Sequence, residues 1–189
     1  MKMLLRRIIC YSPGVLLMML VCILFSACSI NPIAADAKSS VHSSGAQKGS
    51  ASESQIAQTV FAAINKDRAA AKLPALKWSS QLAASAHQHN LAMKAANTLS
   101  HQLPNEAAFG DRERKQGVQW WFAAENIGET SDQTQAGALG LHKAMMAEKP
   151  PEDGHRQNIL TKQGTILGVD VLIDTQNHIL WLTEDFARV

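Results

Sequence analysis

The stretch that decides the fold is ILGVDVLIDTQNHILWLTEDF, residues 166–186. Aliphatic and aromatic side chains dominate residues 166–173 and again residues 179–182, and this composition is typical of β-strands. Between the two runs, Asp174-Thr175-Gln176-Asn177 consists of residue types that favour turns. The stretch therefore predicts a β-hairpin near the C-terminus.

Upstream of this hairpin the apolar residues change to helical spacing. Ser52 and Gln55 form the pattern of a helix-capping box, and Ile56, Val60 and Ile64 then recur on one helical face. The predicted helices span residues 52–71, 79 or 80 to 98, 104–117, and 131 or 132 to 148, and residues 120–124 are predicted to add a strand. We expect an α+β fold, an α-β-α sandwich with about four helices around a small antiparallel sheet that ends in the hairpin.

Residues 1–27 have the three parts of a lipoprotein export signal. The basic residues Lys2, Arg6 and Arg7 precede an uncharged apolar stretch over residues 15–25. Leu24 to Cys28 resembles a lipobox, although Phe25 stands where an aliphatic residue is usual. We predict cleavage before Cys28 and lipidation of Cys28; an ordinary signal peptide and an uncleaved membrane anchor remain as alternatives.

The segment after Cys28 has the composition of a tether. Residues 29–51 are rich in Ser, Ala and Gly and have no apolar period, so they cannot bury enough surface to fold. The predicted organisation is a signal peptide over residues 1–27, a lipidated Cys28 with a disordered tether to residue 51, and one domain over residues 52–189. This organisation places the domain in the cell envelope, anchored to a membrane outside the cytoplasm, and on the outer membrane if the host is Gram-negative.

The charge balance argues against nucleic acid as a partner. Three of the 18 basic residues and none of the 16 acidic residues precede Cys28. The exported part is therefore close to neutral, whereas binding to phosphate backbones needs a basic face.

A series of short motifs runs through the folded part in a fixed order. It consists of Asn65 and Arg68 before Leu73–Trp78, His89 with Met93, Ser100-His101, Asp111-Arg112 with Gly117, Glu125-Asn126-Ile127, His155-Arg156 with Asn158-Ile159-Leu160, and Gly168-Val169. This series resembles the CAP superfamily, also called SCP-like or pathogenesis-related-like, and especially its bacterial exported members. The resemblance covers residues 55–186 and implies the same α-β-α sandwich.

The resemblance also implies a cavity lined by two histidines and two acidic residues. By position these are His101, His155 and Glu125, with Asp111 as the fourth member and Glu106 and Glu113 as alternatives to it. Two imidazoles beside carboxylates form a donor set that suits Zn²⁺ or another divalent metal. A buried polar network without metal is the structural alternative.

Three functions remain open at this point. The first is a binding or envelope-accessory module whose cleft holds a metal or a small apolar or lipid-like ligand. The second is a metal-assisted hydrolase acting on peptide or envelope substrates, with Glu125 as its base; the chain has neither an H-E-x-x-H pair nor a G-x-S-x-G elbow. The third is a protein-interaction domain in which the acidic loop 148–153 contacts a partner.

The sequence also predicts the positions of Glu184 and His142. The family has a Gln where this chain has Glu184, and we expect Glu184 to lie at a solvated strand end rather than near the cleft. His142 is expected on the surface of its helix.

Overall fold

The computed structural model describes residues 51–189, so the predictions for the leader, Cys28 and the tether lie outside the described residues. The elements, in chain order, are α1 (Glu53–Ala70), β1 (Lys77–Trp78), α2 (Ser80–Ala96), α3 (Phe109–Lys115), β2 (Phe122–Thr130), α4 (Gln135–Met146), α5 (Gly154–Ile159), β3 (Ile166–Asp174) and β4 (Ile179–Arg188). None of the described helices is long and apolar enough to cross a membrane.

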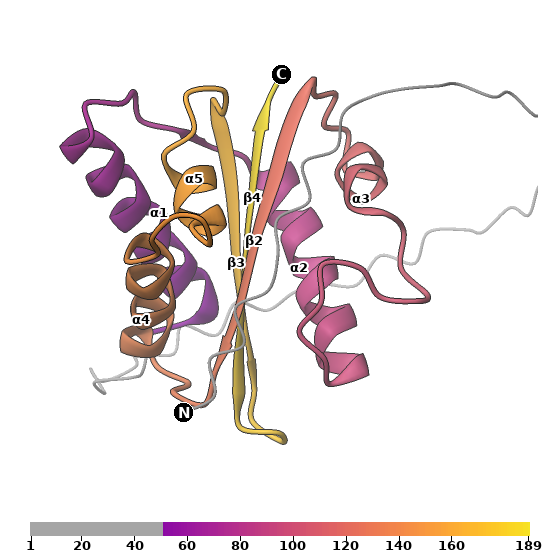
Figure 1. The fold of residues 1–189 in the computed structure, drawn as a ribbon. Helices are drawn as coiled ribbons and strands as arrows, with labels where there is room; N and C mark the ends of the chain where they lie inside the picture. Colours follow the sequence, from indigo (N-terminus) through magenta and orange to yellow (C-terminus); the bar gives the residue numbers. More distant parts are fainter. Residues whose placement is uncertain (1–50) are drawn as a thin grey trace, which may run out of the picture. The chain divides into compact units, whose positions relative to one another are not determined.

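The described domain has three layers. The sheet has the strand order β1-β3-β4-β2; α1, α4 and α5 cover one face, and α2 and α3 cover the other (Figure 1). The predicted α+β sandwich is therefore confirmed.

The hairpin lies at the centre of the sheet. β3 and β4 pair antiparallel from Ile166–Ala187 to Asp174–Ile179, and β2 pairs antiparallel with the other edge of β4. The sheet is mixed rather than purely antiparallel, because β1 pairs parallel with β3. A strand of two residues is too short to produce a pattern in the sequence.

The helix boundaries agree best where a cap is present. Ser52 and Gln55 form the predicted capping box of α1, and Ser79 caps α2 through Leu82 N. The third helix is shorter than predicted, because residues 104–106 form a turn and a bend, residues 107–108 are irregular, and α3 begins at Phe109. α4 begins at Gln135, later than predicted, because the Thr134 hydroxyl caps it.

One other boundary was wrong, and one helix was missed. The predicted strand over residues 120–124 is displaced to Phe122–Thr130, so Trp120 and Trp121 precede it. α5 was not predicted as a helix, since six residues are too few for a helical period to show.

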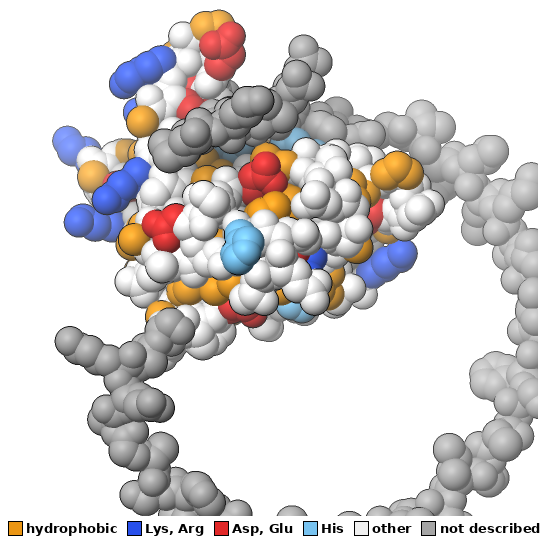
Figure 2. All heavy atoms as spheres, turned by 90° about the horizontal axis from the view of Figure 1, so that it is seen from below, with side chains coloured by type: hydrophobic (Ala, Val, Ile, Leu, Met, Phe, Trp, Pro, Cys, Tyr) orange, Lys and Arg blue, Asp and Glu red, His pale blue; other side chains and the backbone are white. Residues whose placement is uncertain are grey.

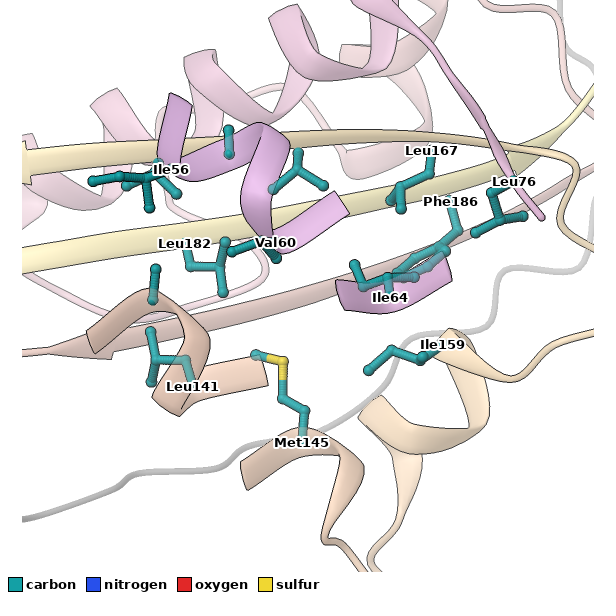
Figure 3. Close-up of a cluster of buried hydrophobic side chains, with 14 of the residues drawn as sticks. Ile56, Val60, Ile64, Leu76, Leu141, Met145, Ile159, Leu167, Leu182 and Phe186 are labelled. Atoms are coloured by element: carbon teal, nitrogen blue, oxygen red, sulfur yellow. The ribbon is translucent and has the colours of Figure 1, made fainter. Parts of the chain in front are cut away.

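The main hydrophobic core lies between the sheet and the α1–α4–α5 layer (Figure 3). It includes Ile56, Ile64, Leu141, Ile159 and Phe186. Two smaller clusters pack between the sheet and the α2 layer, one around Met93 and Trp181 and one around Leu82 and Ala187. Residues 51–189 thus contain a core on both faces of the sheet, and we expect this segment to fold on its own.

Gly168 on β3 allows α2 to approach the sheet closely. A Cβ at this position would collide with backbone atoms of Leu82 and Ala83. We predict that Gly168→Ala lowers the free energy of unfolding by about 2–3 kcal/mol, because the helix backbone must shift. Gly140→Ala is the matched control, since nothing lies within 4 Å of a Cβ there. Urea unfolding of both variants tests this, and equal losses would contradict the close approach.

Candidate functional site

His101 forms the first of two histidine–carboxylate pairs. It lies in the segment between α2 and α3, and its Nδ1 is 2.8 Å from Oε1 of Glu125 on β2. The Glu125 side chain is only 3% exposed and that of His101 is 11% exposed. Because a carboxylate accepts hydrogen bonds, the contact favours the tautomer that carries a proton on Nδ1.

His155 forms the second pair, with a partner that the sequence did not indicate. Its Nδ1 is 2.6 Å from Oε1 of Glu148, and its backbone N–H donates to Oε2 of the same carboxylate at 3.0 Å. Both side chains are nearly buried. Glu148 lies in the long loop that departs from the family pattern, so no motif could identify it; its only signal was its place in an acidic loop before the histidine.

β2 connects the two pairs. Asn126, next to Glu125, donates to the backbone carbonyl of His155 at 3.2 Å. Asn158 on α5 donates to the carbonyl of Glu125 at 3.3 Å and to Oδ1 of Asn126 at 2.9 Å. β2 therefore links the three residues that the sequence predicted. Glu125 on this strand contacts His101 directly, and the neighbouring Asn126 contacts the backbone of His155.

Asp111 lies apart from the two histidine–carboxylate pairs. Its side chain is 64% exposed and pairs with Arg114 at 3.5 Å, whereas Arg112 and Glu113 are buried. Successive residues of a helix point about 100° apart, so α3 turns Asp111 to the solvent while its two successors face the sheet.

Of the two alternatives to Asp111, Glu106 is partly buried and Glu113 is buried, and their contacts differ. Glu106 Oε1 lies 2.7 Å from Nδ1 of His89 and 3.2 Å from Nε of Arg112. Glu113 is fully buried and neither of its carboxyl oxygens has a hydrogen-bond partner among the described residues. Arg112 in turn donates to Oε2 of Glu125 at 2.5 Å, so it connects Glu106 to the His101 pair.

We call Glu106, Arg112, Glu113, Glu125 and Asp185 the charged cluster. Within it, the pKa values of neighbouring carboxyl groups shift in opposite directions. Burial opposes ionisation of Glu125, but the His101 hydrogen bond and the Arg112 charge outweigh it and lower the pKa of Glu125 to about 2. Burial, together with the charges of Asp185 and Glu125, raises the pKa of Glu113 to about 10. Burial and the Glu125 charge also raise the pKa of Asp185 well above its usual value. At neutral pH the cluster therefore contains an ionised Glu125 and a protonated Glu113.

The raised pKa of Glu113 predicts a pH-dependent stability. The folded state retains a proton on Glu113 between the unfolded pKa near 4.5 and the folded pKa of about 10. Stability contributed by this group is therefore complete below pH 4.5 and is lost as the pH rises through that window. We predict that Glu113→Gln raises the free energy of unfolding by about 1–3 kcal/mol at pH 8 and by less than about 0.5 kcal/mol at pH 5.

Urea unfolding at both pH values measures this difference. Glu152→Gln is the matched control, because Glu152 is exposed, and it should change the stability equally little at both pH values. A Glu113→Gln effect that is the same at pH 5 and pH 8 would contradict the protonated state.

Two expectations about surface position were wrong. His142 is only 2% exposed, and its Nε2 lies 2.8 Å from Oδ2 of Asp67 on α1. Glu184 is completely buried and accepts a hydrogen bond from Asn126 at 2.9 Å. Burial raises the pKa of Glu184. Both residues lie inside the layers because α4 packs over the sheet, which helix periodicity alone did not show.

Two of the three acidic side chains in the loop 148–153 point into the domain, while Lys149 to Glu152 are exposed. Glu148 points inward to His155, and the buried Asp153 accepts a hydrogen bond from Gln157 at 2.6 Å. Of its three acidic residues, only Glu152 is exposed.

A cavity of about 620 Å³ lies next to the charged cluster, between α2, the 103–107 segment and α3. Six of its thirteen lining residues are apolar, four of them alanines, and Glu106 and Arg112 contribute the charges on its inner side. The lining residues are Ser85, Gln88, Ala92, Ala95, Ala96, Leu103, Pro104, Asn105, Glu106, Ala107, Arg112, Lys115 and Gln116. The cavity thus borders the His101–Glu125 pair through Glu106 and Arg112, without His101 or His155 in its lining.

The donor set for a metal consists of the two imidazoles. A carboxylate on Nδ1 is the usual support of a metal-binding histidine, and His101 and His155 each have one. Within residues 51–189 no three His, Cys, Asp or Glu side chains are grouped closely enough to hold a metal ion. The carboxylates therefore orient His101 and His155 as they would two histidine ligands of a metal. A metal would need its remaining ligands from water or from a bound molecule.

Comparison with known proteins gives a consistent family. The model of the cysteine-rich secretory protein family, CAP, matches residues 61–186. An extracellular SCP-domain protein from Bacillus anthracis has a TM-score of 0.61 and 30% identity over 72% of this chain and 41% of its own. A cysteine-rich secretory protein from Staphylococcus aureus has a TM-score of 0.56 and 20% identity over 72% of this chain and 39% of its own.

A third structure has a more similar length. An outer surface protein from Borrelia burgdorferi has a TM-score of 0.63 and 14% identity over 74% of this chain and 97% of its own, which shows the same fold. The chain spans only about two fifths of the Bacillus and Staphylococcus chains. No curated protein matches significantly.

Proposed function

Because the chain belongs to the cysteine-rich secretory protein (CAP) family, we propose that it is a lipid-anchored binding module of the cell envelope. The structurally similar proteins from Bacillus, Borrelia and Staphylococcus are described as extracellular, outer surface and secretory proteins. The export pattern before Cys28 supports the same compartment for this chain. Its domain then acts outside the cytoplasm, on the outer membrane if the host is Gram-negative.

The anchor is the lipid on Cys28. Cells that produce the full chain should incorporate a labelled fatty acid into it, and Cys28→Ser should abolish that labelling. Cys22→Ser is the matched control and should keep the label, because Cys22 lies within the cleaved leader. Labelling that persists in Cys28→Ser would refute the anchor without affecting the fold of residues 51–189.

The observation that carries the binding function is the cavity between α2 and α3. Its volume of about 620 Å³ lies within the roughly 300–1,000 Å³ typical of small-molecule sites. Ala92, Ala95 and Ala96 provide an apolar wall on α2, and Lys115 is an exposed cation on its rim. An apolar wall with one cationic rim position suits a small amphipathic ligand with an alkyl or ring body and an anionic head.

A fluorescent fatty acid, cis-parinaric acid, is a suitable probe of this cavity. The mature chain from residue 29 should bind it with a rise in fluorescence, and Ala95→Trp should abolish the rise by filling the cavity. Ala62→Trp is the matched control, because Ala62 is also exposed but lies on α1, in the opposite layer. Equal binding by the two tryptophan variants would refute the cavity as the site.

The second candidate is a metal-assisted hydrolase, and the two histidine–carboxylate pairs favour it. A divalent metal such as Zn²⁺ would be held by His101 and His155, and when bound it would supply an activated water. Glu125 and Glu148 would fix the two imidazole rings. Metal analysis of the wild type and of the double variant His101→Ala, His155→Ala tests this. Equal metal contents would refute the metal site and leave the cavity unaffected.

A further inference from the structure

One end of the sheet brings together residues that are far apart in the sequence. The backbone N–H of Trp121 donates to the carbonyl of Arg188, and Thr165 connects Lys77 to Ala187 through two backbone hydrogen bonds. These residues lie where β2 and β3 begin and β4 ends, and the C-terminus marks this end in Figure 1. We call Lys77, Arg114, Trp121, Lys162 and Arg188 the strand-end surface.

Trp121 is the apolar centre of this surface. Its side chain is 55% exposed, and the Arg188 guanidinium lies 4.6 Å from its ring centre. Val189, next to Arg188, is 65% exposed. Among the described residues the only other exposed large apolar side chain is Leu91, on α2. Exposed large apolar side chains are therefore concentrated at this end.

The charged side chains at this end of the sheet are mainly positive. Lys77, Lys162 and Arg114 are exposed, and Arg114 lies 4.3 Å above the ring of Trp120. Asp111 pairs with Arg114 at 3.5 Å, and it is the one exposed acidic residue in α3. The strand-end surface thus combines four cations spread across the end of the sheet with one exposed indole, which Arg188 contacts directly.

The other end of the sheet has a different character. There Glu53 accepts from the backbone of Ile173, and Asp174 accepts from the turn that follows β3. Figure 2 shows this end from below: acidic and hydrophobic side chains are scattered over it, and Lys and Arg gather mainly to one side. Because Glu53 is at the start of α1, the chain enters the domain at the end opposite to Trp121.

We propose that the strand-end surface docks on an anionic lipid bilayer. An indole at the interface of head groups and acyl chains, surrounded by lysine and arginine beside lipid phosphates, is the combination that bilayer surfaces favour. A flat polyanion would use the cations but would not require an exposed indole next to Val189. This contact goes beyond the proposed function, since it needs neither the lipid on Cys28 nor the cavity.

Vesicles of phosphatidylcholine with about 30% phosphatidylglycerol, compared with phosphatidylcholine alone, test the docking. A chain that begins at residue 29, and so lacks Cys28 and its lipid, should sediment with the anionic vesicles and not with the neutral ones. Its tryptophan emission should shift to the blue, because Trp121 leaves water while Trp181 is already fully buried. Raising the salt concentration should weaken the binding.

Substitutions in the strand-end surface test whether it is the part of the domain that binds the vesicles. Lys77→Gln with Lys162→Gln should weaken binding about 20- to 30-fold, at about fivefold per cation, and Trp121→Ala should abolish the emission shift. Lys143→Gln with Lys149→Gln removes the same charge from exposed positions on and after α4, and Leu91→Ala removes another exposed apolar side chain. Both controls should bind as the wild type does.

Three results would overturn the proposal. The first is equal binding to neutral and anionic vesicles. The second is an equal loss of binding in the Lys143, Lys149 control. The third is tighter binding to soluble heparin than to vesicles with no blue shift in either case, which would indicate a polyanion as the partner instead of a bilayer.

Discussion

Arg112→Leu should lower the free energy of unfolding by about 3–5 kcal/mol, the largest loss we expect from a single substitution in this domain. Arg112 is only 5% exposed and donates to Glu125 at 2.5 Å. The charges of Glu125 and Asp185 outweigh the burial of Arg112 and raise its pKa. Without the guanidinium, the ionised Glu125 loses its main cation in a buried site, and an uncompensated buried charge is strongly destabilising.

Urea unfolding at pH 7 measures this loss. Arg114→Leu is the matched control, because Arg114 lies two residues away on the same helix but its side chain is 44% exposed. It should cost less than about 1 kcal/mol, as exposed ion pairs do. Equal losses in the two variants would mean that Arg112 contributes only helix packing and no electrostatic support to Glu125.

Arg68→Met should lower the free energy of unfolding by about 3–4 kcal/mol, because buried carbonyl groups lose their donors. The buried guanidinium of Arg68 donates to the carbonyls of Pro74, Ile159 and Thr161 at 3.0, 2.8 and 2.8 Å. It thereby attaches the end of α1 to the end of α5. Methionine retains much of the apolar stem but none of these donors.

Lys66→Met provides the comparison for this variant, since Lys66 is exposed on the same helix. It should leave the unfolding midpoint in urea nearly unchanged. If Arg68→Met also leaves the midpoint unchanged, water replaces the guanidinium at the three carbonyls and the proposed attachment of α5 is wrong.

Local sequence patterns predicted the elements that have a strong period or a cap. The 166–186 hairpin, the capping box at Ser52 and the long helices α1 and α2 follow directly from residue types and spacing. β1 and α5 escaped because two and six residues carry too little pattern. The parallel pairing of β1 depends on contacts across the domain, which no local pattern encodes.

The family motif indicated which side chains would lie close together, but not all of their partners. Glu125 and His101 form a direct pair, and His155 is linked to the same strand through Asn126. Asp111 faces the solvent, because one position on a helix decides whether a side chain faces the solvent or the sheet. Glu148, His142 and Glu184 gained their roles from the packing of α4 and its following loop against the sheet, so their burial could not be inferred from spacing.

The strand β2 connects both histidines to Arg112 and, through Arg112, to the cavity. Glu125 on this strand holds His101 and Arg112, and the neighbouring Asn126 holds the backbone of His155. Arg112 and Glu106 then form the inner side of the cavity between α2 and α3. A ligand in that cavity would therefore lie beside the charges that fix the His101 pair, which connects the proposed binding function to the family motif.

Native mass spectrometry of the domain purified from the exported fraction of its producing cells tests the proposed binding function most directly. If the cavity between α2 and α3 binds a ligand, the wild type and Ala62→Trp should retain a ligand of roughly 200–500 Da, a size that suits a site of this volume. Ala95→Trp, with its cavity filled, should carry none. A bare mass for all three proteins, or the same adduct on all three, would contradict a ligand site between α2 and α3.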